Sequence, residues 1–289
     1  MKRLRNITGV TDGLEAFNMK MRIIAAAALL PLLLIVLIAL PAVFTAILIG
    51  LVCALAAYEF LWATGMVKDI RLVIYTAVMA FLVAGWSYFE TGYAAAVLGV
   101  IAFTVVLFSE FMFSHGKPSF EKIAVCLTGG LLIPFFLSAL VRLRAGYNGA
   151  FLVLIPFLLA FVSDSGAYFA GSFLGKHKLA PSISPNKTIE GMLGGVIAAM
   201  VGMLIYCLIL DLAFGFTVYY LNALAYGVIG ALAGVFGDLC FSAVKRQAEI
   251  KDYGNLIPGH GGILDRFDSM TVIAPITEVL LIILPVAVR

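Results

Sequence analysis

The 289-residue sequence has few charged residues. Only 12% of its residues are Asp, Glu, Lys or Arg, whereas 63% are hydrophobic, and its mean hydropathy is +1.10. Ordinary soluble proteins contain roughly 25% charged and roughly 45–50% apolar residues. The shortage of charge argues against a soluble enzyme, a disordered chain and a nucleic-acid-binding module, because none of these leaves so much apolar side chain without water-facing charge. It predicts an integral membrane protein.

Cysteine and histidine are also scarce, with four and three residues. The cysteines, Cys53, Cys126, Cys207 and Cys240, fall inside different apolar runs and share no paired spacing. We expect small packing residues rather than a disulfide framework or a zinc site. The histidines are too scattered in sequence to form a histidine metal motif.

Long apolar runs are abundant. They are continuous over about twenty residues, the length that a helix needs to cross about 30 Å of hydrocarbon. We therefore predict an all-α polytopic membrane protein with about nine transmembrane helices, or eight if the chain does not turn at Leu40-Pro41. The predicted spans are 23–40, 41–63, 72–89, 93–113, 123–141, 150–171, 191–212, 221–244 and 271–288.

The lysines and arginines orient these spans. With a cytoplasmic N-terminus, only Arg142, Arg144 and Arg289 of the 19 basic residues fall outside, as the positive-inside rule favours. The C-terminus is then outside and the protein lies in a cell inner or plasma membrane. A signal peptide is disfavoured because residues 23–40 exceed the usual apolar core of about 7–15 residues and a second span follows at once.

Three regions follow from this topology. They are a basic cytoplasmic tail (1–22), an N-terminal transmembrane region of about five helices (23–149), and a catalytic transmembrane region (150–289) with cytoplasmic loops at 172–190 and 245–270.

Five acids lie inside predicted spans, where an ionisable group costs about 2.5–3.5 kcal/mol. The topology places all five in the cytoplasmic half. For Glu59, Glu110 and Glu278 two interpretations stay open: a functional role, or an acid that reaches interfacial water. For Asp164 and Asp238 the neighbouring residues favour function.

The loop after the sixth span has features of a phosphate site. Asp164, Tyr168 and Gly171 share one helix face, and the loop ends in SPNKTIEG at residues 184–191. A helix start with free backbone N–H groups is expected there, and Lys187 adds positive charge. The predicted substrate-binding residues here are Asp164, Ser184, Asn186, Lys187, Thr188 and Glu190.

The segment with the strongest evidence for a catalytic site runs from residue 237 to residue 269. Asp238, Ser242, Lys245 and Arg246 follow at helical spacing and line one face. The loop beyond adds Lys251, Asp252, His260, Asp265, Arg266 and Asp268. Carboxylates hold Mg²⁺, and cations neutralise a polyphosphate while a nucleophile attacks in line. The alternative is a solvated loop that only sets topology, but such a loop needs only Lys or Arg.

The sequence SAVKRQAEIKDYGNLIPGHGGILDRFD (242–268) closely resembles the signature of the phosphatidate cytidylyltransferase, or CDP-diacylglycerol synthase, family. Gly237-Asp238-Leu239, SDSGAYFAG (163–171) and SPNKTIEG are also similar to elements of that family. The resemblance is strong over residues 150–270. Residues 1–149 resemble the family only in being basic and then multispanning.

The resemblance implies that CTP and phosphatidic acid react to give CDP-diacylglycerol and pyrophosphate. It implies Mg²⁺ in a two-metal site with Asp238 and Asp265 as ligands, and a homodimer. The expected catalytic residues are Asp238, Lys245, Arg246, Lys251, Asp252, His260, Asp265, Arg266 and Asp268, with Ser242 in substrate binding. Replacing Asp265 with Asn is expected to abolish turnover in a protein that still folds.

Three rival functions are considered. A CTP-dependent lipid kinase would release CDP rather than pyrophosphate. A secondary transporter also places acids near broken helices, but it needs a path to both faces, whereas these ionisable residues cluster on one side. A purely structural membrane protein has no need for Asp238, His260 and Asp265 together.

Overall fold

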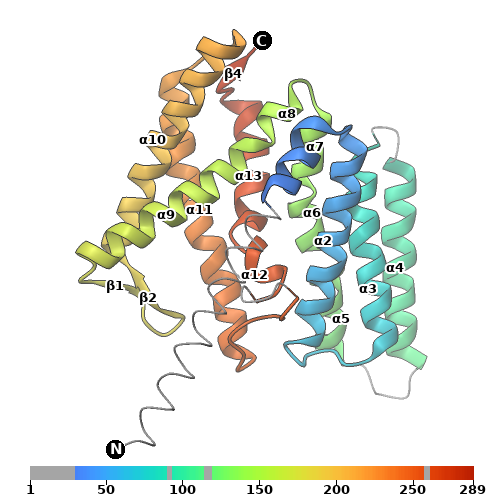
Figure 1. Ribbon diagram of the computed structural model, residues 1–289. Helices are drawn as coiled ribbons and strands as arrows, with labels where there is room; N and C mark the ends of the chain where they lie inside the picture. Colours follow the sequence, from blue (N-terminus) through green and yellow to red (C-terminus); the bar gives the residue numbers. More distant parts are fainter. Residues whose placement is uncertain (1–29, 90–92, 114–118, 257–260) are drawn as a thin grey trace, which may run out of the picture.

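The computed structural model describes residues 30–89, 93–113, 119–256 and 261–289. Within these residues, six helices are long and apolar enough to cross a membrane. Long helices pack side by side, and their connections gather at the two ends (Figure 1). The protein is therefore a multi-pass membrane protein, as its composition predicts.

The N-terminal region forms a bundle, coloured blue to green in Figure 1. Its elements are the π-helix η1 Ile35–Ala39, α2 Ala42–Trp62, α3 Ile70–Trp86, α4 Tyr93–Phe113, α5 Phe120–Leu127, the π-helix η2 Thr128–Leu132, α6 Ile133–Leu137, α7 Ala139–Ala145 and α8 Gly149–Leu152. The elements between Phe120 and Ala145 together make one apolar span.

The predicted turn at Leu40-Pro41 is present. Leu40 has an extended backbone, with ψ 156°, and α2 begins directly after Pro41. The guanidinium of Arg144 stabilises the break, because it donates to the carbonyl oxygens of Leu37 at 2.6 Å and Leu40 at 2.7 Å. Residues 23–63 are therefore not one helix.

The C-terminal region contains two of the longest helices. Its elements are α9 Leu154–Leu174, β1 Lys178–Ala180, β2 Ser184–Thr188, α10 Ile189–Phe214, β3 Thr217–Val218, α11 Tyr220–Gln247, α12 Leu264–Phe267, α13 Met270–Ile283 and β4 Ala287–Val288. The strands form two small antiparallel sheets, β1 with β2 and β3 with β4. The all-α prediction missed both sheets because strands of two to five residues leave no periodic pattern in sequence.

Glycine allows the C-terminal helices to approach closely. A Cβ on Gly194 would overlap the side chain of Ala170, and one on Gly227 would come 2.5 Å from the Cα of Met200. Gly237 lies against the next segment of the chain, since a Cβ there would come 2.8 Å from the carbonyl oxygen of Asp268. This contact holds α11 directly against the chain that carries Asp268.

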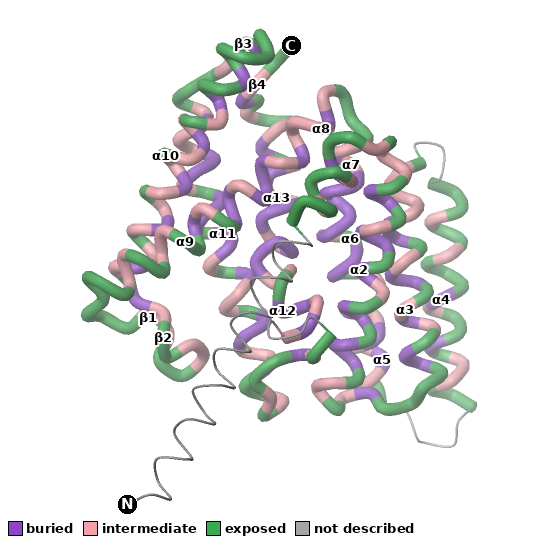
Figure 2. Tube along the Cα trace, in the orientation of Figure 1, coloured by how far each residue is buried: buried purple, intermediate pink, exposed green. Residues whose placement is uncertain are grey.

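Burial is uneven across the bundle. Purple buried segments concentrate between α2, α11 and α13, whereas α4 is mostly green and pink (Figure 2). Only Phe103 and Leu107 of α4 are buried. The exposed apolar face of α4 suits contact with lipid rather than water.

The three other predicted spans coincide with shorter elements. Leu30–Ala39 and Ile70–Trp86 are apolar but shorter than 18 residues, and α13 has 14 residues. The total of nine spans and the side of the membrane on which each terminus lies therefore stay predictions.

Candidate active site

The candidate site lies where four elements meet at one end of the bundle. The ends of α2 and α11 lie on either side of the short helix α12, and the β1–β2 hairpin lies beyond α11 (Figure 1), to which Lys187 and Arg246 tie it. The polar face predicted on α11 is present, because the Ser242 hydroxyl donates to Asp238 Oδ1 at 3.0 Å. This contact places Asp238 one helical turn before Ser242, on the side of α11 that faces the site.

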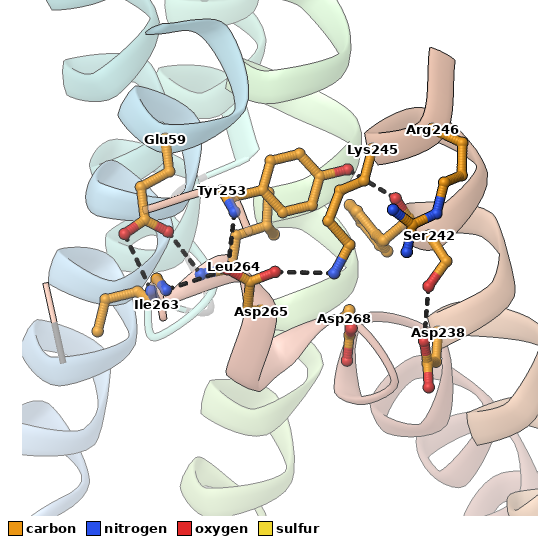
Figure 3. Close-up of polar contacts among 12 residues, drawn as sticks. Glu59, Asp238, Ser242, Lys245, Arg246, Tyr253, Ile263, Leu264, Asp265 and Asp268 are labelled. Atoms are coloured by element: carbon orange, nitrogen blue, oxygen red, sulfur yellow. Dashed lines mark hydrogen bonds and ion pairs between the residues drawn. The ribbon is translucent and has the colours of Figure 1, made fainter. Parts of the chain in front are cut away.

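Lys245 and Asp265 form a buried ion pair beside this face. Lys245 Nζ lies 2.8 Å from Asp265 Oδ1, and each residue is only 9% exposed. Asp265 Oδ2 accepts the backbone N–H groups of Tyr253 at 2.8 Å and Gly262 at 3.0 Å (Figure 3). One carboxylate thus ties α11 to both ends of the loop between Tyr253 and Gly262.

Tyr253 completes this buried region and was not predicted as a site residue. Its phenol donates to the carbonyl oxygen of Phe241 at 2.9 Å, and its ring lies 5.3 Å from Lys245 Nζ. Burial, together with the charge of Asp265, raises the pKa of Tyr253, so the phenol stays neutral and keeps its proton as a donor. An aromatic residue within a polar, glycine-rich loop is the signal that could have indicated it.

Three acids from different elements lie close together. Asp164 on α9 and Asp268 after α12 are both near enough to Asp238 for their charges to interact. Lys187 on β2 bonds directly to Asp238 Oδ2 at 2.5 Å. The structure thus brings together Asp164, Lys187 and Asp238, which the sequence analysis placed in separate motifs. The three acids Asp164, Asp238 and Asp268 are here called the Asp238 cluster.

Positive charge surrounds the Asp238 cluster. Burial, followed by repulsion from Asp238, raises the pKa of Asp268 to about 7, while Lys245 and Lys187 oppose the rise. Arg266 adds its charge on the side of Asp164. Such a mixture of acids and cations suits a polyanion that arrives together with a metal ion.

The start of α10 differs in part from its prediction. The Thr188 hydroxyl accepts from the backbone N–H of Gly191 at 3.1 Å, so this group is not free for a phosphate. Glu190 accepts from the backbone of Lys176 at 3.1 Å and bonds the ring of His177 at 2.6 Å. Thr188 and Glu190 therefore stabilise the hairpin and the helix start.

Thr188→Val is expected to lower the free energy of unfolding by about 1 kcal/mol, because it removes the hydroxyl that caps α10. Thermal unfolding in detergent, followed by circular dichroism, measures this change. Thr188→Ser keeps the hydroxyl and serves as the matched control. Equal unfolding midpoints for the Val and Ser variants would contradict the capping role.

The other predicted residues have varied positions. Arg246 donates to the carbonyl oxygen of Ile183 at 3.1 Å and so ties the hairpin to α11. Ser184 and Asn186 lie on β2 with Lys187. Lys251, Asp252 and Arg266 are exposed, whereas His260 lies outside the described residues.

The acids in the helices have unequal roles. Glu59 is 2% exposed and accepts backbone N–H groups from Ile263 and Leu264, so the interpretation that it reaches interfacial water is wrong. Glu278 pairs with Arg142 at 2.6 Å. Arg142 belongs to α7, which lies toward the end of the bundle away from α12 (Figure 1). The expectation that Glu278 lies in the same half of the bundle as Asp238 is therefore wrong.

Possible metal ligands are limited. Across the stretches that the structure describes, no three His, Cys, Asp or Glu side chains are close enough to hold a metal ion by themselves. In Figure 3 the carboxyl of Asp268 lies between those of Asp265 and Asp238. Any metal ion here would need further ligands from a substrate or water.

Comparisons with known proteins agree with this arrangement. Phosphatidate cytidylyltransferases of Staphylococcus saprophyticus subsp. saprophyticus and Staphylococcus haemolyticus are each 38% identical over 183 residues, which is 63% of this chain and 68% of the relative. The enzyme of that name from Staphylococcus aureus matches to the same extent. The family model described as the cytidylyltransferase family matches residues 20–284. The chain therefore belongs to the cytidylyltransferase family.

Proposed function

We propose that the protein transfers the cytidylyl group of CTP to phosphatidic acid, giving CDP-diacylglycerol and pyrophosphate for phospholipid biosynthesis. The observation that carries this proposal is the Asp238 cluster, with Lys187, Lys245 and Arg266 around it, at one end of an apolar helical protein. The relatives named phosphatidate cytidylyltransferase support the same reaction.

The reaction balances without a strong base. An oxygen of the phosphatidate phosphate forms a bond to the α-phosphorus of CTP, and the bond from that phosphorus to the oxygen bridging to the β-phosphorus breaks. Pyrophosphate leaves with the bond electrons. Because phosphatidate is already an anion, the protein's task is to position two anions and to stabilise the charge that develops on the leaving group.

The basic residues fall into two groups: partly or fully exposed side chains that can reach a substrate, and the buried Lys245, which is held in place. The Lys187 side chain is 25% exposed, so its ammonium can turn from Asp238 toward a substrate phosphate. Arg266 and Lys251 are exposed and stabilise the charge on pyrophosphate. Lys245 is held by Asp265, and it therefore acts through the shape and potential of the site. Ser184, Asn186 and Asp164 place the nucleotide or the lipid headgroup, whereas Asp252 and His260 orient the substrates.

The acids fit a magnesium ion bound jointly with substrate. Asp238 and Asp265 would hold it, with Asp268 between them, and nucleotide phosphates and water would complete its coordination. Asp265 accepts three hydrogen bonds and so keeps a lone pair available. Bound Mg²⁺ would polarise the phosphates and neutralise part of their charge.

The site suits a water-soluble nucleotide that meets a lipid headgroup. We place it on the cytoplasmic side, where CTP is available and where the basic loops are expected. A homodimer is the assembly that the resemblance implies. Light scattering of the protein in detergent would test that assembly.

The test of function uses CTP labelled at both the α- and γ-phosphates, incubated with purified protein, phosphatidic acid and Mg²⁺. We expect α label in the lipid and γ label in pyrophosphate. Label from the γ-phosphate in a lipid would instead show a kinase. Absence of any transfer by folded protein would overturn the proposal, and uptake of label into proteoliposomes would then favour a transporter.

A further inference from the structure

Glu59, in the N-terminal region, makes direct contact with the candidate site. It lies one turn before the end of α2, yet its carboxylate reaches the chain that carries Asp265. Its Oε1 accepts the backbone N–H of Ile263 at 3.0 Å, and its Oε2 accepts that of Leu264 at 2.8 Å. These residues are more than 200 positions apart in sequence.

Both N–H groups lie at the start of α12, where a helix leaves backbone donors without an internal partner. Glu59 is only 2% exposed, so the two bonds are made away from water. Leaving a buried donor without an acceptor is costly, and a charged acceptor makes stronger bonds than a neutral one. The carboxylate thus fixes the position of this backbone.

The backbone of two loop glycines packs against the same carboxylate. A Cβ on Gly254 would come 2.5 Å from Glu59 Oε1, and one on Gly262 would overlap the carboxyl group. The backbone at both positions therefore lies directly against Glu59. Glycine is required there for close approach, because any larger side chain would push the loop away.

The turn that Glu59 contacts also carries the site residue Asp265. Gly262 donates to Asp265 and Leu264 adjoins it, so Glu59 and Asp265 hold opposite sides of the same turn (Figure 3). Asp268 follows within one helical turn of Asp265. A shift of α12 would move both acids relative to Asp238 on α11.

We propose that Glu59 is a positioning residue for cytidylyl transfer: from α2 it fixes the backbone of α12 and thereby sets where Asp265 and Asp268 lie against Asp238. This inference rests on the proposed function. Both carboxylate oxygens of Glu59 are bonded to this backbone, so Glu59 acts through the turn that it holds.

The test compares Glu59→Gln with Glu278→Gln. Glutamine has a similar shape but presents an NH₂ group to one of two N–H donors, so one bond is lost and the turn shifts. Glu278 is a matched control, because it too is a bonded acid within an apolar helix, but its partner is Arg142 of α7, away from the candidate site. We expect Glu59→Gln to lower kcat by roughly 10–100-fold and to raise the Mg²⁺ concentration at half-maximal rate.

A merely structural role predicts a different result. Glu278→Gln is expected to lower the unfolding midpoint while kcat and the Mg²⁺ dependence, measured well below that midpoint, stay normal. If Glu59→Gln behaves in the same way, the proposal is overturned. If wild-type protein transfers no cytidylyl group, the proposed function fails instead, so the two failures are distinguishable.

A second variant keeps the test decisive if Glu59→Gln does not fold. Gly254→Ala pushes the loop from the intact carboxylate, and we expect a similar loss of kcat. Adding Glu59→Ala to Gly254→Ala removes the overlap, so the two changes should be strongly non-additive. Additive effects on kcat, or a normal kcat in Gly254→Ala, would show that this contact does not position the site.

Discussion

Asp238→Asn is expected to reduce cytidylyl transfer by roughly 10²–10³-fold, because it removes the negative charge that would help to hold Mg²⁺ and that now binds Lys187. Asparagine still offers an oxygen to the Ser242 hydroxyl, so the contact one turn along α11 can persist. The lysine side chain is partly exposed and can be solvated. Steady-state rates over a range of Mg²⁺ concentrations measure the loss.

Asp211→Asn provides the matched control. Asp211 lies near the far end of α10 and accepts from the exposed Tyr220 phenol at 3.0 Å. The same change of charge there should leave kcat unaltered. Near-normal turnover of Asp238→Asn at saturating Mg²⁺ would remove Asp238 from the proposed metal site.

Asp265→Ala is expected to destabilise the protein by about 3–5 kcal/mol, the cost of leaving one member of a buried ion pair without its partner. The replacement also leaves the N–H groups of Tyr253 and Gly262 without an acceptor. Lys245→Met should cost less, because Asp265 then keeps both backbone bonds. Chemical denaturation in detergent, with tryptophan fluorescence and circular dichroism as two probes, measures both changes.

Asp252→Ala is the control for Asp265→Ala, because it tests whether removing any acid of this loop would destabilise the protein equally. Asp252 is exposed, and exposed substitutions usually change stability by less than about 0.5 kcal/mol. Wild-type stability in Asp265→Ala would refute the structural role of the pair. The burial of Asp265 also changes the expectation for Asp265→Asn, which should now lose stability as well as activity, so Asp238 offers the cleaner test of metal binding.

Spacing along single helices predicted the contacts within those helices. The i, i+4 relation of Asp238 and Ser242 is a property of the helix itself, and the structure confirms it. Hydropathy predicted the multi-pass class because the bilayer sets a minimum length for each span.

Contacts between distant segments could not be predicted in this way. The bonds from Ile263 and Leu264 to Glu59 depend on how α2 packs against α12, and no periodicity encodes that packing. The same holds for the pair between Arg142 and Glu278, which lies far from the site although Glu278, like Asp238, is an acid inside an apolar segment. Hydropathy locates a helix but does not state which neighbour its polar residue will meet.

The contacts of Glu59 make the catalytic region, residues 150–289, dependent on the N-terminal transmembrane region. Residues 150–289 carry every acid of the candidate site, yet the turn bearing Asp265 is held by an anion from α2. A fragment that begins at residue 150 would expose two amides and a glycine-lined hollow in place of that anion. Chimaeras that exchange the N-terminal helices between relatives should therefore assemble a working enzyme only when the donor supplies an acid at this position.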